Sequence, residues 1–194
     1  MRAAGTILAV VALLSAAPAA DGGAPASKVF LTQDEALKLA FPGCAVERRT
    51  AFLDEVDRKR AAELAGKGVD VDQRVVYFYE GRRDGKLVGT AYFDAHRVRT
   101  LDEVLMFVID DRAHVQRLEM LSFGEPEEYI PRGKWYAQFV GKGLSDDLRL
   151  KGDIKGVTGA TLTATATTSA ARRTLALHTV LAEKSARRSA AGPR

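Results

Sequence analysis

The sequence predicts an α+β fold in which helices pack on an antiparallel sheet of about four or more strands, with a long helix at the C-terminal end. The first observation is a pair of β-rich segments, 74–83 and 86–96, which flank Asp84-Gly85, a strong signal for a tight hairpin turn. The second is another such pair, 103–110 and 114–123. The third is a stretch from about 161 to 184 in which small and apolar residues recur at helical spacing.

The remaining elements follow from capping and turn signals. Residues 32–41 open with a capping box formed by Thr32 and Glu35, which predicts a short helix. Residues 44–53 fit a strand, and residues 54–68 fit a charged amphipathic helix that a glycine ends. The side chains expected to face inward are Leu37, Leu39 and Ala40 from the first helix, and Leu162, Ala166, Ala170, Leu177 and Leu181 from the last.

The first 20 residues have the pattern of a secretory signal peptide, in which Arg2 precedes an apolar stretch that small residues follow. This apolar run is shorter than the ~20 residues of a membrane span, so an uncleaved anchor is the less favoured alternative. We expect export to the periplasm or to the outer face of the cytoplasmic membrane. The remaining segments expected are a linker at 21–29, one domain at 30–184 and a basic, disordered tail at 185–194.

The charge distribution argues against a nucleic-acid binder. The formal net charge is +4, of which Arg2 contributes one unit and the segment 183–194 contributes three. The rest of the chain is therefore neutral, whereas a nucleic-acid-binding domain needs a basic face on its folded body. Cys44 is the only cysteine, so the chain cannot form an internal disulfide, a CxxCH haem site or a cysteine zinc cluster.

A run of threonines, GVTGATLTATATTSAARR at residues 156–173, marks the predicted start of the last helix. Gly159 permits a tight turn, Ala160 leaves the approach open, and Thr161 stands at or near the helix N-terminus, where free amides and the helix dipole favour an anion. These residues could therefore seat a phosphate group. The alternative is that the threonines are helix caps and small packing residues.

The segment VTGATLT, residues 157–163, resembles the [ST]-G-A-T-x-[ST] signature of the FMN-binding domain family, whose members include components of sodium-pumping NADH:quinone reductase and Rnf-type complexes and many small exported proteins. The segment 96–139 is similar to the sheet and following loop of those small members. The resemblance implies FMN bound through a phosphoester to Thr161 by a flavin transferase. It also implies Thr158, Gly159, Ala160 and Thr163 as the other cofactor-binding residues.

This resemblance implies an exported flavoprotein that exchanges electrons with an envelope or membrane redox donor and acceptor, without a catalytic residue of its own. Lys155 stands where the family usually has an acidic residue, three places before Thr158, and Asp153 lies two residues earlier. The alternative is a non-enzymatic ligand-binding or accessory module of the same fold without covalent flavin. A flavin reductase with a substrate of its own would need a substrate pocket that the sequence does not reveal.

Some other polar and aromatic residues could line the flavin site. The three histidines have no metal-ligand spacing, so we expect structural roles for them and no metal site, with a place near the flavin as the alternative for His96. Glu125 beside Pro126 could shape the pocket or form a plain turn. Three aromatic side chains after the sheet fit either the core or a flavin ring: Tyr129, Trp135 and Tyr136.

Overall fold

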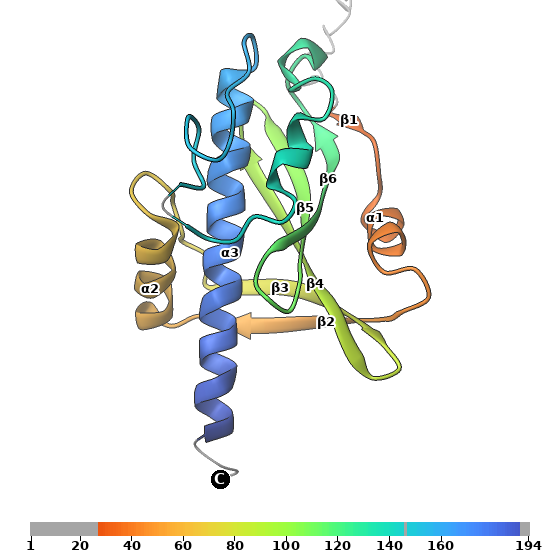
Figure 1. The fold of residues 1–194 in the computed structure, drawn as a ribbon, viewed down its shortest axis with the longest axis vertical. Coiled ribbons are helices and arrows are strands. Elements are labelled where there is room, and N and C mark those ends of the chain that lie inside the picture. Colours follow the sequence, from red (N-terminus) through yellow and green to blue (C-terminus); the bar gives the residue numbers. More distant parts are fainter. Residues whose placement is uncertain (1–26, 146, 191–194) are drawn as a thin grey trace, which may run out of the picture.

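In the computed structural model, which describes residues 27–145 and 147–190, the chain forms a six-stranded sheet with antiparallel neighbours throughout (Figure 1). The order across the sheet is β1-β6-β5-β4-β3-β2. The strands are β1 (Lys28–Val29), β2 (Ala45–Phe52), β3 (Val75–Arg83), β4 (Lys86–Arg97), β5 (Asp102–Ile109) and β6 (Val115–Phe123). The α+β fold predicted from the sequence is confirmed, including the helices packed on the sheet and the long C-terminal helix.

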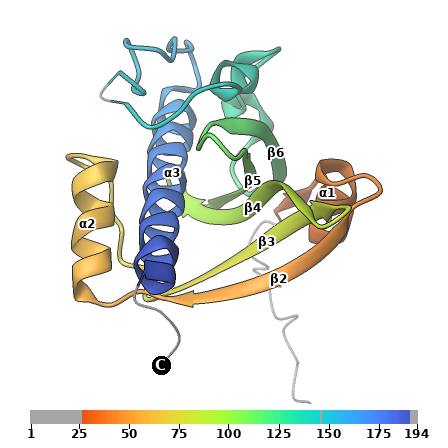
Figure 2. The same ribbon diagram turned by 60° about the horizontal axis from the view of Figure 1, so that its bottom comes forward.

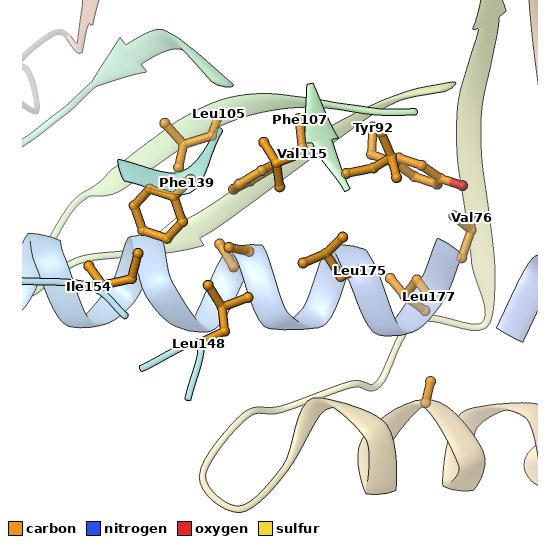
Figure 3. Packing of buried hydrophobic residues seen from close by; sticks show 14 of the residues in the cluster. Val76, Tyr92, Leu105, Phe107, Val115, Phe139, Leu148, Ile154, Leu175 and Leu177 are labelled. Carbon is orange, nitrogen blue, oxygen red and sulfur yellow. The ribbon is translucent and has the colours of Figure 1, made fainter. Parts of the chain in front are cut away.

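Helices cover both faces of the sheet. The helices α2 (Glu55–Ala65) and α3 (Thr161–Ala190) lie on one side, and α1 (Gln33–Ala40) lies on the other (Figures 1 and 2). The α3 side holds the larger core, in which Leu105, Phe107 and Leu175 are buried (Figure 3). Because side chains alternate along a strand, the neighbouring residues Met106 and Val108 of β5 belong to the smaller core under α1.

The predicted β3–β4 hairpin is confirmed. Asp84 and Gly85 have φ angles of 50° and 77°, and positive φ at both central positions is the mark of a type I′ turn. The second predicted hairpin, between β5 and β6, is confirmed as well, and its loop closes differently. Asp110 accepts hydrogen bonds from the backbone N–H groups of Arg112 and His114 at 2.9 and 2.8 Å, and Ala113 takes the left-handed conformation at φ 61°.

The short helices agree with the sequence signals. Helix α1 begins with the Thr32–Glu35 capping box, and α2 ends at Gly66, as predicted. The expectation that Leu39 faces inward is wrong, since its exposure is 49 %; Ala36 and Leu37 supply the buried contacts of this short helix. Between β6 and α3 lie a 3₁₀ turn, η1 (Glu127–Tyr129), and a 3₁₀ helix, η2 (Trp135–Phe139).

Two expectations about the ends of the domain need correction. Within the expected linker 21–29, Lys28 and Val29 form β1 and pair with β6. The expected disordered tail begins as helix, because α3 continues to Ala190 and Arg187 binds the buried carboxylate of Asp57 at 3.0 Å. The expected signal peptide and residues 21–26 and 191–194 lie outside the described residues. Within the described part of the chain, every helix is too short or too polar to cross a membrane.

The buried face of α3 differs from the apolar stripe predicted for it. Leu162 is 56 % exposed and does not face the sheet, whereas Ala170 and Leu177 are buried as expected. Threonine and alanine make up most of the first half of the buried face. Small side chains at a contact let a helix approach its neighbour closely. The buried threonines and alanines of this half are Thr163, Ala164, Thr167, Thr168, Ala170, Ala171 and Thr174.

Candidate functional site

A cavity of about 240 Å³ lies at the start of α3, and we call it the helix-start cavity. Four of the five cofactor-binding residues expected from the sequence line it, whereas Thr158 is exposed and is not part of its lining. The lining residues are Val98, Arg99, Glu125, Tyr129, Gly159, Ala160, Thr161, Leu162 and Thr163. The fold thus brings the threonine segment together with the loop after β4 and the segment after β6.

The turn before α3 presents the first helical residues to this cavity. Gly159 has a φ of 87°, a left-handed conformation that glycine adopts without strain. The carbonyl of Ala160 accepts the hydrogen bond from Ala164 N at 3.0 Å, which begins the helical pattern. The amides of the first turn have no acceptor within the helix, and together with the helix dipole they favour an anion.

The two threonine hydroxyls of the cavity differ in accessibility. Thr161 is exposed, and its hydroxyl makes only a long hydrogen bond of 3.4 Å to the carbonyl of Val157. Thr163 is fully buried, and its hydroxyl donates to the carbonyl of Tyr129 at 2.6 Å. Thr161 therefore presents its hydroxyl oxygen to solvent, whereas Thr163 fixes the helix against η1.

Glu125 organises the opposite wall of the cavity. One oxygen of its carboxylate accepts hydrogen bonds from the backbone N–H groups of Thr100 and Leu101 at 2.5 and 2.8 Å, and from the Thr100 hydroxyl at 3.1 Å. The hydrogen bonds from these backbone amides hold the pKa of Glu125 below its ordinary value. The bound loop also carries Arg99, another residue that lines the cavity.

A buried charge network, Asp94, His96, Glu103 and Arg173, lies between the sheet and α3. The ring of His96 bridges two carboxylates, with Nδ1 at 2.9 Å from Asp94 Oδ1 and Nε2 at 3.0 Å from Glu103 Oε2. Glu103 is 0 % exposed. Arg173 donates from Nε and Nη2 to the two oxygens of Asp94, at 2.8 and 2.6 Å. With His96 protonated, two cations and two anions offset one another, as buried charges require.

The protonation of His96 follows from its neighbours. Burial alone would lower the pKa of this imidazole, but the hydrogen bonds to Asp94 and Glu103 outweigh it and raise the pKa to about 9. Burial likewise opposes ionisation of Asp94, yet hydrogen bonds from His96 and Arg173 lower its pKa. His96 is thus a buried imidazolium at neutral pH.

Two hydroxyls complete the coordination of Glu103. Thr167 donates to Oε2 at 3.0 Å, and the phenol of Tyr136 donates to Oε1 at 2.9 Å. Burial, followed by the charge of Glu103, raises the pKa of Tyr136, so this phenol remains a donor. Thr167 lies one helical turn after Thr163. The network therefore begins one turn along α3 from the helix-start cavity.

Sequence reasoning missed the network apart from His96. Asp94 and His96 are two residues apart on β4, so their side chains point to the same face of the sheet. His96 pairs in register with Glu103 of β5. The antiparallel pairing of β4 with β5 aligns these residues, and the sequence signal for it is the register between the two predicted hairpins. Nothing local indicates Arg173, which lies 79 positions from Asp94.

The other residues considered from the sequence have structural contacts. The indole Nε1 of Trp135 donates to the carbonyl of Lys155 at 2.7 Å, and the side chain is buried in the core. The ring of His178 bonds the hydroxyl of Tyr92 at 2.9 Å, and burial lowers its pKa. His114 lies in the β5–β6 loop, where its backbone contacts Asp110.

Comparisons of this chain with protein-family models, with curated proteins and with solved structures gave no match, so the FMN-binding resemblance stays a prediction.

Proposed function

We propose that this protein is an exported FMN carrier in which a phosphoester joins FMN to the hydroxyl of Thr161. The observation that carries the proposal is the exposed Thr161 hydroxyl at the start of α3, in a cavity that also contains Arg99. A phosphoester at this oxygen would place a negative charge beside the first-turn amides, in a cavity that Arg99 also lines. These amides and the helix dipole stabilise such a charge.

The helix-start cavity fits part of an FMN molecule. Its volume of about 240 Å³ lies below the roughly 300–1,000 Å³ of most small-molecule pockets, so it would enclose the phosphate end and leave much of the cofactor at the surface. When bound, FMN accepts one or two electrons. An incompletely enclosed cofactor suits a carrier that meets a redox donor and acceptor better than an enzyme that encloses its own substrate.

Each wall of the cavity has a distinct task in this proposal. Glu125 holds the loop that carries Arg99, and Thr163 fixes the first turn of α3 through Tyr129.

Lys155 has an exposed side chain, and its backbone N–H donates to Gln138 Oε1 at 2.9 Å. Its side chain is therefore accessible to a flavin transferase, and Lys155→Asp should raise flavin loading if the transferase favours an acidic residue there.

Co-expression with a flavin transferase tests the proposal through flavin fluorescence on a denaturing gel. The unmutated protein should fluoresce, Thr161→Ala should not, and Thr161→Ser should keep part of the signal. Thr165→Ala is the matched control, because Thr165 is the next exposed threonine on the same helix, one turn further on. Fluorescence that persists in Thr161→Ala would exclude this residue as the anchor. A dark unmutated protein would favour the accessory-module alternative, which equilibrium dialysis against FMN would then examine.

A further inference from the structure

Strand β2 forms an open edge of the sheet. It is the last strand in the order, it pairs with β3 alone among the described strands, and every residue from Ala45 to Phe52 except Ala51 is exposed. Figure 2 shows β2 as the outermost strand, beyond β3. An edge of this length presents a row of backbone N–H and C=O groups that a further strand can pair with.

The sequence of β2 is complementary to itself in one antiparallel register. In an antiparallel pair, directly opposite residues point to the same face, so a two-fold axis normal to the sheet pairs only residues of equal parity. With the axis at Arg48, Glu47 lies opposite Arg49 of the second copy, and Arg49 lies opposite Glu47 of the second copy. Shifting the axis by one residue in either direction sets Glu47 against Glu47 or Arg49 against Arg49, which is repulsive.

The remaining pairs of this register are compatible. Val46 lies opposite Thr50 of the second copy on the other face, and the exposed side chains of Val46 (40 %) and Phe52 (69 %) gain neighbours. At the two-fold axis, Arg48 of one copy lies opposite Arg48 of the second copy. Its guanidinium lies over the ring of Tyr77, 4.4 Å from the centroid. Because Tyr77 belongs to β3, this contact draws the charge away from the open edge and reduces the repulsion.

We infer that two copies of this chain associate through antiparallel pairing of their β2 strands, with the two-fold axis at Arg48, so that one sheet runs through both copies. The occupant of the edge is a second copy because the charges of β2 complement those of β2 itself. The helix-start cavity is built from α3 and the loops after β4 and β6, so it has no residue in this interface. The inference is therefore independent of the proposed function.

The test uses charge reversals at Glu47 and Arg49 that weaken the dimer singly and restore it together. Sedimentation velocity of the full chain, at concentrations up to millimolar, measures the dimerisation. The unmutated chain should dimerise. Glu47→Arg sets an arginine opposite the native Arg49, and Arg49→Glu sets a glutamate opposite the native Glu47, so each should raise the dimer Kd about tenfold or more. An equal mixture of the two variants should form a heterodimer, and the exchanged pair Glu47→Arg/Arg49→Glu should dimerise like the unmutated chain.

Controls separate pairing from folding. Within one chain, Arg49 also contacts Glu47 at 2.9 Å and Glu80 at 3.5 Å, so thermal melts by circular dichroism must accompany each variant. Glu63→Arg, the same charge change at an exposed position of α2, should leave the dimer Kd unchanged. A monomeric unmutated chain, a dimer that neither reversal weakens, or a mixture of folded variants that does not associate would each overturn the inference.

Discussion

His96 and Glu103 face each other across β4 and β5, with the imidazole Nε2 3.0 Å from a carboxylate oxygen that is fully withdrawn from solvent. Asp94 holds the other ring nitrogen at 2.9 Å, and Arg173 of α3 binds Asp94 in turn. The network thus joins two strands to the helix that begins at the candidate site. Its charges make the stability of this junction depend on pH.

We predict that stability falls in alkaline solution because of His96. Its pKa is about 9 in the folded protein against an ordinary value of 6.5, so the folded state holds the proton more tightly than the unfolded chain. The contribution is fully present below pH 6.5 and is lost as pH rises through about 9. It is on the order of 3 kcal/mol. Urea unfolding at a series of pH values should show this decline, and His96→Gln should flatten it; an equally steep decline in the variant would contradict the assignment.

Thr167→Val should destabilise the protein by about 1–3 kcal/mol, because it leaves the buried Glu103 carboxylate without one of its donors. The substitution keeps the size and branching of the side chain, so the loss reports the hydrogen bond. Thr165→Val is the control on the exposed face of the same helix, and its effect should stay within about 0.5 kcal/mol. Equal losses in the two variants, measured by chemical denaturation, would show that Glu103 does not need this hydroxyl.

Glu125→Gln should loosen the loop that carries Arg99 while leaving Thr161 in place. The charged carboxylate accepts from the amides of Thr100 and Leu101, and a neutral amide oxygen is a weaker acceptor. Hydrogen exchange at these two amides should therefore be faster in the variant, and flavin loading should fall. Unchanged protection of both amides would mean that the loop is held by other contacts.

Gly85→Val should lower the free energy of unfolding by about 1 kcal/mol or more without affecting flavin attachment. The cost comes from the φ of 77°, which a β-branched residue resists, because a Cβ at this position would meet no neighbouring atom. Thermal melts and gel fluorescence of the same preparation give both readouts. Loss of flavin at an unchanged melting temperature would contradict a purely structural role for this turn.

The parts of the fold that the sequence predicts are those set by residues close in the chain. Asp84-Gly85 specifies its turn and the Thr32–Glu35 capping box specifies the start of α1, because each signal acts within three or four residues. The extension of α3 to Ala190 is accompanied by a contact between Arg187 and Asp57, 130 positions earlier, which no local pattern reveals. Local composition, rich in arginine and small residues, suggested disorder there.

The residues of the candidate site also fall into a group that is close in the chain and a group that is not. The cavity residues Gly159 to Thr163 form one continuous segment, which a motif can reveal, whereas the network around Glu103 joins positions far apart in the chain. Thr167 illustrates the difficulty. A hydrophobic pattern counts threonine as polar and so assigns Leu162 to the core. Thr167 is buried instead, and its hydroxyl donates a hydrogen bond to Glu103.

A single bond, between the oxygen of Thr161 and the phosphate of FMN, defines the proposed attachment. Trypsin cuts after Lys155 and Arg172, so residues 156–172 form a single peptide that contains all the threonines of the segment. Mass spectrometry of this peptide, from protein isolated from its native source, tests this bond. We predict a mass increase of FMN less one water, with fragment ions placing it on Thr161. An unmodified peptide, or FMN on another threonine, would contradict it.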